Sequence, residues 1–237
     1  MTILFEDFSS DEDVYEQTII KVVMLGQSGS GKTSIVLRFI KDTFTENPKT
    51  TVGANFFIRK IIIDKKPLCV RVWDTSGQER FNSLIPLYYR NANIAILVTD
   101  IKDNSSLTKI KYWVNEMKET VKQIPIIGIA INKTDQYDET LNSQTLEQIQ
   151  EYGKSLDAVV LETSAKNGEG VFEIFQKVIE KLVKERYNSI FPSKLKEEEA
   201  KYENNINPNN ALTTIGNEEN DQSDEKGEEK ETKTGCC

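Results

Sequence analysis

Short apolar runs alternate with stretches of helical spacing along the middle of the chain. Apolar runs predict strands, and apolar residues recurring every three or four positions predict helices. The predicted strands are 18–25, 54–64, 67–74, 93–99, 125–131 and 158–162, and the predicted helices are 32–41, 81–91, 105–121, 144–154 and 170–185. This alternation predicts an α/β fold with a six-stranded, mostly parallel sheet and helices on both faces. The turn between the second and third strands is too short for a crossover, so we expect an antiparallel hairpin there.

Charge separates the two ends of the chain from its middle. The 237 residues carry a formal net charge of −8; residues 1–17 contribute −6 and residues 187–237 another −6, so residues 18–186 carry an excess of positive charge. Both ends are polar and bury too little apolar surface to offset the loss of chain entropy on folding. We therefore predict an acidic disordered extension at 1–17, one folded domain at 18–186 and a disordered tail at 187–237.

A glycine-rich segment lies between the first predicted strand and the first predicted helix. Residues 26–33 read G-Q-S-G-S-G-K-T, which fits the phosphate-loop pattern G-x-x-x-x-G-K-[ST] in the strand–loop–helix context that the pattern requires. Small residues let backbone N–H groups surround phosphate oxygens, and the helix N-terminus adds the positive end of its dipole. Lys32 is expected to meet the outer phosphates, and the Thr33 hydroxyl to bind Mg²⁺.

A second segment with phosphate-sensing chemistry follows the third predicted strand. Residues 73–81 read W-D-T-S-G-Q-E-R-F. Asp74 stands at the end of the strand, where a carboxylate can reach Mg²⁺ through water. Gly77 can offer its backbone N–H to a terminal phosphate, and Gln78 is placed to orient an attacking water. Alone, an Asp-x-x-Gly segment is equally consistent with an ordinary turn, but together with a phosphate loop it favours a nucleotide-driven switch.

Two further segments indicate which base is bound. N-K-T-D at 132–135 and T-S-A-K at 163–166 both follow predicted strands, and strand ends are where open α/β sheets bind ligands. A carboxylate at Asp135 can accept hydrogen bonds from the N1–H and exocyclic amine of guanine, whereas adenine has no donor at N1. Asn132 is expected to tie this loop to the phosphate loop, and the stem of Lys133 to lie over the purine.

Together these motifs resemble the small GTPases of the Ras superfamily, and the Rab family in particular, over about residues 18–186. Rab-like features are W-D-T-x-G-Q-E-R-F, the Y-Y-R at 88–90 and the two final cysteines. V-L-R-F at 36–39 and T-V-G-A-N-F at 51–56 are most similar to the early-endosomal group. The resemblance implies the P-loop NTPase, small GTPase fold and a monomeric GTP hydrolase that cycles between GTP-bound and GDP-bound states.

The resemblance also implies roles for matching residues. Thr51 corresponds to the switch threonine that binds Mg²⁺ and meets the γ-phosphate only in the GTP state, Phe44 to the aromatic that packs against guanine, and Ala165 to the backbone donor to the base oxygen. The catalytic residues are then Gln78, Lys32 and Gly77, and the metal ligands Thr33, Thr51 and Asp74. The expected GTP contacts are Gly26, Ser28, Gly29, Ser30, Gly31, Lys32, Thr33, Ser34, Phe44, Thr51, Gly77, Asn132, Lys133, Asp135, Ser164, Ala165 and Lys166.

Protein partners are implied by the same resemblance. Phe56, Trp73 and Tyr88 match an aromatic trio that effectors read, although core packing would explain an aromatic at Trp73 equally well. Phosphoryl transfer needs positioning and charge stabilisation, and no built-in arginine finger is recognised, so slow intrinsic hydrolysis assisted by a GTPase-activating protein is expected. The other implied partners are an exchange factor, a GDP-dissociation inhibitor and a prenylation escort protein; no nucleic-acid polymer is expected.

The three cysteines are predicted to differ in role. Cys69 falls within a predicted strand and reads as a small buried side chain. Cys236 and Cys237 resemble the Rab substrate for double geranylgeranylation. One lipid binds a membrane only marginally and the acidic tail has no polybasic patch, so two lipids are expected. Without a signal peptide or a long apolar run, the chain is expected on the cytoplasmic face of intracellular membranes, endosomal by the finer resemblance, with a chaperone-bound cytosolic pool.

Three alternatives are distinguishable in the sequence. A metabolic P-loop kinase or ATPase would share residues 26–33 but lack N-K-T-D and T-S-A-K. A GTP-binding module with slow turnover would be expected to lose Gln78, Thr51 or Lys32, and all three are present. A secretory Rab-like protein would differ only in route. Family members usually have alanine where this chain has Ser76, so we expect altered hydrolysis or switch kinetics there, with nucleotide affinity nearly intact.

Overall fold

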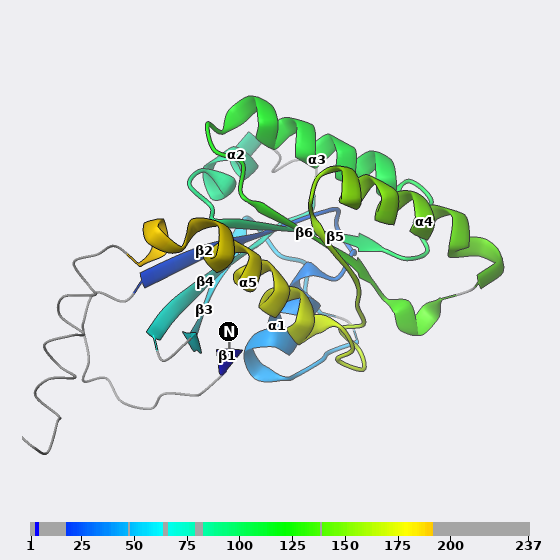
Figure 1. Cartoon of the computed structure of the whole chain (residues 1–237). Coiled ribbons are helices and arrows are strands. Elements are labelled where there is room, and N and C mark those ends of the chain that lie inside the picture. Colours follow the sequence, from blue (N-terminus) through cyan, green and yellow to red (C-terminus); the bar gives the residue numbers. More distant parts are fainter. Residues whose placement is uncertain are drawn as a thin grey trace, which may run out of the picture. The chain divides into compact units, whose positions relative to one another are not determined.

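The computed structural model describes residues 3–4, 18–46, 48–63, 66–78, 83–137 and 139–191 (Figure 1). The strands are β1 (Ile3–Leu4), β2 (Thr18–Leu25), β3 (Ala54–Ile63), β4 (Lys66–Thr75), β5 (Ile94–Asp100), β6 (Ile126–Asn132) and β7 (Val159–Glu162). The helices are α1 (Lys32–Lys41), α2 (Ile85–Tyr89), α3 (Ser106–Thr120), the 3₁₀ turn η2 (Thr134–Gln136), α4 (Glu139–Ser155) and α5 (Val171–Ile190).

The strands form one mixed sheet in the order β1-β3-β4-β2-β5-β6-β7. Neighbouring strands from β4 to β7 are parallel, and β3 pairs antiparallel with β4 as the predicted hairpin. The predicted mostly parallel α/β sheet is therefore confirmed. Because β2, β4, β5 and β6 are parallel, their carboxyl ends meet at one edge of the sheet, where folds of this class place their ligands.

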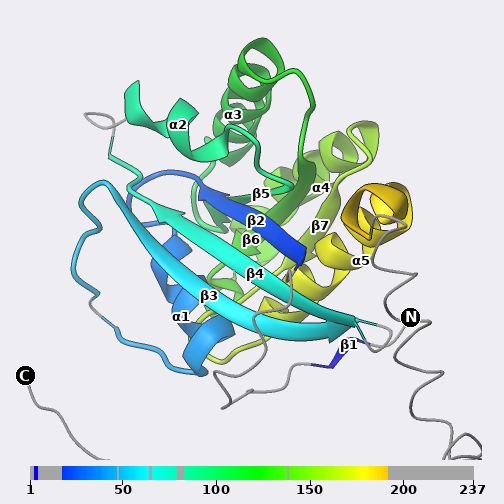
Figure 2. The same ribbon diagram turned by 90° about the vertical axis from the view of Figure 1, so that its left-hand side faces the viewer.

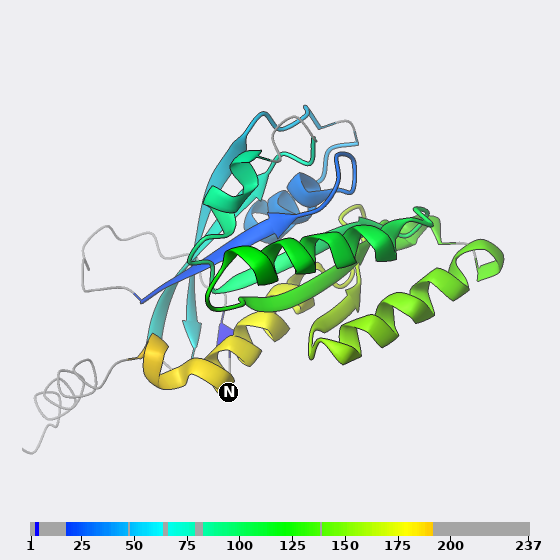
Figure 3. The same cartoon turned by 90° about the horizontal axis from the view of Figure 1, so that it is seen from above.

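Helices cover both faces of the sheet (Figures 1 and 3). Apolar side chains of α1 and α5 form one core with β2, β4 and β5, and those of α2, α3 and α4 form a second core on the opposite face. Alternation along β2 produces this division, since Ile20 and Val22 belong to the first core and Val23 and Leu25 to the second.

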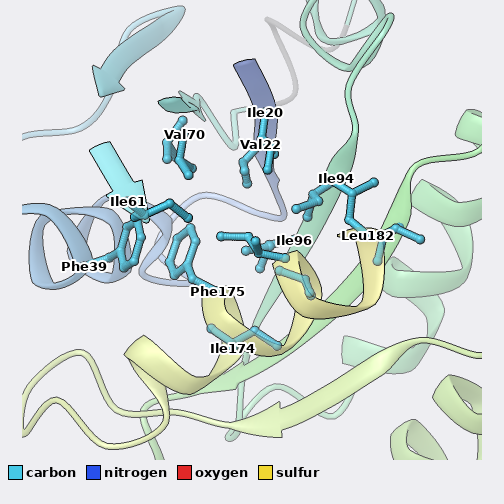
Figure 4. Close-up of a cluster of buried hydrophobic side chains, with 14 of the residues drawn as sticks. Ile20, Val22, Phe39, Ile61, Val70, Ile94, Ile96, Ile174, Phe175 and Leu182 are labelled. Carbon is cyan, nitrogen blue, oxygen red and sulfur yellow. The ribbon is translucent and has the colours of Figure 1, made fainter. Parts of the chain in front are cut away.

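The first core fixes the helix that follows the phosphate loop. Phe39 of α1 stacks on Phe175 of α5, with ring centroids 3.8 Å apart, and both side chains are fully buried. Figure 4 shows the two rings beside Ile61 and Ile96, from β3 and β5. Burying a phenylalanine contributes about 3 kcal/mol to stability, so this contact holds the N-terminus of α1 at the ligand-binding edge of the sheet.

β1 lies in a segment for which no strand was predicted. Ile3 pairs with Ile63 and Leu4 with Ile62, so a seventh strand extends the predicted six-stranded sheet at its β3 edge. A two-residue strand is too short for a periodic signal, and its pairing satisfies backbone groups at an edge that would otherwise be open. The rest of the predicted disordered extension, apart from β1, lies outside the described residues.

Helix ends also differ from prediction. α2 begins at Ile85, later than expected, with Pro86 in its first turn, a position that proline favours; residues 81–82 of the prediction are outside the described part. α4 begins earlier, at Glu139. α5 continues past residue 185 to Ile190 and bends at Arg186 (φ −127°, ψ 27°). The bend brings Ile190 and Phe191 into the core, so the folded part extends beyond the predicted boundary at 186.

Candidate functional site

The phosphate loop holds its lysine in a buried position. Lys32 is 5% exposed, and its Nζ donates to the carbonyl oxygens of Gly26 at 2.9 Å and Gln27 at 2.7 Å. Burial lowers the pKa of the Lys32 amine to about 8, although the Asp74 carboxylate acts in the opposite direction. Among the described residues, the amine has these two neutral carbonyls as acceptors, so an anion that enters the loop would meet its charge directly.

Gly77 lies against the phosphate loop. The Ser28 N–H donates to the Gly77 carbonyl at 2.9 Å, and a Cβ on Gly77 would stand 2.2 Å from the Ser28 nitrogen. Only glycine permits this approach of two backbones. The structure therefore brings together two segments that lie about fifty residues apart, as expected if both contact one phosphate group.

Three predicted metal ligands meet at one point. The Thr33 hydroxyl donates to Asp74 Oδ2 at 2.7 Å and lies 3.0 Å from the Thr51 hydroxyl, which is itself 3.5 Å from Asp74 Oδ2. Asp74 Oδ1 is buried and has no hydrogen-bond partner among the described residues. Burial raises the pKa of Asp74, while the Thr33 hydrogen bond and the Lys32 charge lower it.

Mg²⁺ prefers oxygen ligands, and two hydroxyls beside a carboxylate with an unpaired buried oxygen fit such an ion. No group of three or more His, Cys, Asp or Glu side chains that could hold a metal occurs in the described part of the chain. Thr33, Thr51 and Asp74, the predicted ligands, together form a donor set that fits a hard cation.

The loops at 132–135 and 163–166, which we call the base-reading loops, are hydrogen-bonded to the phosphate loop and to each other. Asn132 Nδ2 donates to the Ser30 carbonyl at 2.9 Å, which confirms the predicted link between these loops. A Cβ on Gly31 would lie 2.1 Å from that same Nδ2. Asn132 Oδ1 accepts from the Ala165 N–H at 3.2 Å, the donor that the resemblance assigns to the base oxygen. The Ser164 hydroxyl donates to Asp135 Oδ1 at 2.6 Å and so orients the exposed carboxylate.

Two residues that sequence reasoning did not assign to the site support these loops. Arg38 of α1 donates to the carbonyls of Ala165 at 3.0 Å and Lys166 at 2.8 Å. Asp100, at the carboxyl end of β5, accepts from Lys133 Nζ at 2.7 Å. The place of Asp100 at a strand end could have indicated that it belongs to the site. Nothing in the sequence around Arg38 indicates its role, because its partners lie more than 120 residues away.

A pocket of about 470 Å³ opens between these loops. It is lined by all of the predicted GTP contacts except Gly26, Ser30 and Ser164, which instead hydrogen-bond to Lys32, Asn132 and Asp135. Further lining residues are Glu46, Pro48, Lys49, Thr50, Thr75 and Gln136. The expected nucleotide contacts, drawn from six separate segments of the sequence, therefore surround one cavity.

Ser76 is buried in the segment between Asp74, one of the predicted metal ligands, and Gln78. It is 2% exposed, its N–H donates to the Gly53 carbonyl at 2.7 Å, and its hydroxyl accepts from the Gln78 N–H at 3.3 Å. The serine therefore contacts both the Thr51–Gly53 segment and the segment carrying Gln78. The hydroxyl is bonded to the backbone and is buried, so it does not face solvent.

The aromatic trio forms one cluster beside the sheet. The Trp73 ring lies 5.1 Å from Phe56 and 5.7 Å from Tyr88, between centroids. Trp73 and Tyr88 pack against the second core, while Phe56 remains 45% exposed. The cluster is thus partly core and partly surface. Core packing accounts for Trp73, and the reading of the trio by effectors stays a prediction.

The Ras family model matches residues 21–184. Human Ras-related protein Rab-31 is 41% identical over 157 residues, covering 66% of this chain and 80% of the relative. GTP-binding protein YPT53 of Saccharomyces cerevisiae is 41% identical over 167 residues (69% and 76%). Ras-related protein RABF2b of Arabidopsis thaliana is 39% identical over 162 residues (68% and 80%).

The chain belongs to the Rab family of small GTPases. Membership confirms the prediction of a Rab-family protein most similar to the early-endosomal group, and of a GTP hydrolase with the small GTPase fold. It also places this Rab-family protein in membrane trafficking. Cys69 is buried, as predicted, whereas the lipidation predicted at Cys236 and Cys237 lies outside the described residues. None of the helices described here has both the length and the apolar character to cross a membrane.

Proposed function

We propose that this Rab-family GTPase binds GTP and GDP in the 470 Å³ pocket, hydrolyses GTP to GDP and phosphate there, and uses the cycle to regulate vesicle traffic on an endosomal route. The observation that carries the proposal is the convergence of the phosphate loop, of Thr33 and Thr51, and of the base-reading loops on one cavity. Asp74 lies behind the lining and accepts from Thr33. Each group has chemistry suited to a different part of a guanine nucleotide.

Binding follows from the groups that line the pocket. The backbone N–H groups of Gly29 and of residues 31–33, together with the buried amine of Lys32, suit the phosphates, whereas the N–H groups of Ser28 and Ser30 bond within the chain. Asp135, held by Ser164, suits the two donors of guanine, while Phe44 and the stem of Lys133 provide apolar contact with the base. Thr33, Thr51 and Asp74 are the residues that would hold Mg²⁺, which when bound supplies positive charge beside the phosphate oxygens.

Hydrolysis requires the attack of water on the γ-phosphorus and the departure of GDP. Gln78 orients the attacking water, and the Gly77 N–H and Lys32 amine stabilise negative charge on the transferred phosphoryl group. Among the described residues, no arginine lines the pocket, so a GTPase-activating protein completes the charge stabilisation in trans.

Loss of the γ-phosphate removes the acceptor of the Thr51 and Gly77 N–H groups. Because Ser76 joins the segments that carry these two residues, their rearrangement is coupled. Effectors would read the trio of Phe56, Trp73 and Tyr88 in the GTP state. An exchange factor, a GDP-dissociation inhibitor and a prenylation escort protein complete the cycle, with lipids on Cys236 and Cys237 holding the protein on the cytoplasmic face of endosomal membranes.

Two measurements test the proposal. Single-turnover hydrolysis of radiolabelled GTP by the purified full chain is expected to be slow, Mg²⁺-dependent and specific for GTP over ATP; failure to bind GTP would overturn the assignment of the pocket. Microscopy of the tagged chain, with and without Cys236→Ser and Cys237→Ser, is expected to show endosomal marker overlap that the double variant loses. Overlap with Golgi markers alone would favour a secretory route.

A slow-turnover GTP-binding module is the second candidate, and Ser76 is the observation that favours it. Its hydroxyl accepts from the Gln78 N–H and so constrains the backbone of the residue that orients water. If the constraint holds Gln78 away from the attacking water, hydrolysis is slow even with an activating protein. A Ser76→Ala variant with an increased single-turnover rate would favour this candidate over a normally cycling enzyme.

A further inference from the structure

The outer face of β2, β4 and β3 carries positive charge next to the aromatic trio. Strand register pairs Trp73 with Phe56, and one pleat further along pairs Arg71 with Ile58 on one side and Lys21 on the other. Residues two apart on a strand point to the same face, so Lys21, Arg71 and Ile58 form a row directly beside the trio. We call this row, with the trio, the outer sheet face. Figure 2 shows β2, β4 and β3 side by side, with α1 behind them.

The next pleat continues the same pattern. Cys69 of β4 pairs with Ile19 of β2 and Lys60 of β3. Ile19 is 44% exposed and Ile58 49% exposed. The positions of β2, β3 and β4 on this face include three cations and several exposed apolar side chains, but no aspartate or glutamate.

The two cations of the row have no anionic partner in the part of the chain that the structure describes. Arg71 Nε is buried and makes no hydrogen bond there. Lys21 Nζ donates only to the neutral Arg90 carbonyl at 2.8 Å and lies 5.6 Å from the centre of the Trp73 ring. Burial lowers the pKa of Lys21, with no carboxylate acting against it. The guanidinium of Arg71 and the amine of Lys21 thus have no carboxylate beside them in the described part of the chain, so a carboxylate from a partner would complement their charge.

Geometry narrows the kind of acceptor. Trp73 and Arg71 are two strand positions apart, about 7 Å, and side chains three or four residues apart on a helix are separated by about 6 Å. One partner helix could therefore place an apolar side chain on the trio and a carboxylate on Arg71. Exposed Ile58 and Phe56 beside the charges suit a polypeptide, because one peptide can present an apolar side chain and a carboxylate together.

We infer that the outer sheet face binds a partner helix that carries an aspartate or glutamate three or four residues from a large apolar side chain. Arg71 and Lys21 receive the carboxylate, and Phe56, Trp73 and Tyr88 receive the apolar side chain. This inference rests on the partner surface proposed above and adds to it a charge that selects among helices of similar apolar character.

The test selects random 16-residue peptides on the full chain loaded with a GTP analogue that resists hydrolysis. Peptides selected on the wild type should be enriched in an acid three or four positions from an aromatic or aliphatic residue. Arg71→Gln and Lys21→Gln should each weaken the best peptide about tenfold. Lys118→Gln, which removes an exposed lysine from α3, is the matched control and should leave its affinity unchanged.

A charge exchange makes the test specific. Changing the acid of the peptide to arginine should abolish binding to the wild type and restore much of it to Arg71→Glu. Loss of binding on Phe56→Ala with no effect of Arg71→Gln would overturn the inference and leave the proposed effector surface intact. If Phe56→Ala and Arg71→Gln both bind GTP and both bind the peptides as tightly as the wild type does, the inference and the proposed effector surface are both overturned.

Two other occupants are tested in the same series. Neutralising the six acids of residues 1–17 in the full chain should not change peptide affinity. A marked gain would mean that the chain's own acidic segment occupies the face, which overturns the inference. Sedimentation with phosphatidylcholine vesicles containing phosphatidylserine should not depend on Arg71, and dependence on Arg71 in the absence of peptide would assign the face to lipid instead.

Discussion

The nucleotide pocket and the outer sheet face differ in how their charged groups are paired. Around the pocket, Lys32, Arg38 and Lys133 all donate to oxygen atoms of the chain itself, over 2.7 to 3.0 Å. On the outer sheet face, Lys21 likewise donates to a carbonyl, but Arg71 has no acceptor for its Nε among the residues described. The pocket is thus organised before its ligand arrives, whereas the face has charges that a partner would complete.

This difference has an energetic consequence. Internal hydrogen bonds hold the pocket groups in place, so little reorganisation is needed when nucleotide binds. An unpaired buried donor lowers the stability of the free protein, and that cost is recovered only on binding a complementary acceptor. The groups that bind nucleotide are therefore held in place by the folded chain itself, whereas selectivity for a partner depends on the charge that the partner carries.

The largest effect is expected from a substitution that removes the residue proposed to orient water and keeps the hydrogen bonds within the pocket. Gln78→Leu should retain GTP binding and slow single-turnover hydrolysis about 100-fold, because the attacking water loses its orienting group. The exposed Gln144 of α4 provides the control Gln144→Leu, which should hydrolyse GTP at the wild-type rate. An unchanged rate in Gln78→Leu would contradict the water-positioning role.

A second change tests the exposed end of the pocket. Asp135→Asn should reduce the preference for GTP over XTP about 100-fold, because the amide offers a donor where guanine also donates. Competition binding of the two nucleotides measures the preference. Asp157→Asn removes a surface carboxylate that pairs with Lys181 and serves as the control. Full retention of GTP selection in Asp135→Asn would show that other groups read the base.

Arg38 beside the pocket and Arg71 on the outer sheet face are expected to affect the free energy of unfolding in opposite directions. Arg38→Met removes hydrogen bonds to the carbonyls of Ala165 and Lys166 and should lower the free energy of unfolding by about 2 kcal/mol. Arg71→Met removes an unpaired donor and should raise it by about 1 kcal/mol. Urea denaturation of both variants gives the sign of each change. Equal destabilisation by the two substitutions would mean that Arg71 is satisfied in solution.

The smallest expected effect lies at the junction of the switch segments. Ser76→Ala removes the acceptor of the Gln78 N–H and should change the single-turnover rate about threefold, with nucleotide affinity nearly intact, since one neutral hydrogen bond contributes about 1 kcal/mol. Ser76→Thr keeps the hydroxyl and is the control for its chemistry. If Ser76→Ala matches wild type in hydrolysis and exchange, the hydroxyl has no role in the cycle.

Much of the fold and site was predictable because its signals are local. Strands β2 to β7 are rich in apolar residues, and each loop motif spans fewer than ten residues of sequence. Helix ends were less predictable: α4 begins before its apolar spacing does, and the bend at Arg186 depends on packing of Ile190 and Phe191 against the core. β1 left no periodic signal at all.

The sequence by itself determined the chemistry of the pocket: which residues carry hydroxyls, carboxylates, amines and flexible backbone, and in which order along the chain. Only the tertiary structure decided how these residues support one another, because Arg38 reaches Ala165 and Ser76 reaches Gly53 through folding of distant segments. It also decided that Arg71 stands between Lys21 and Ile58, since strand register, and not sequence spacing, makes those three residues neighbours.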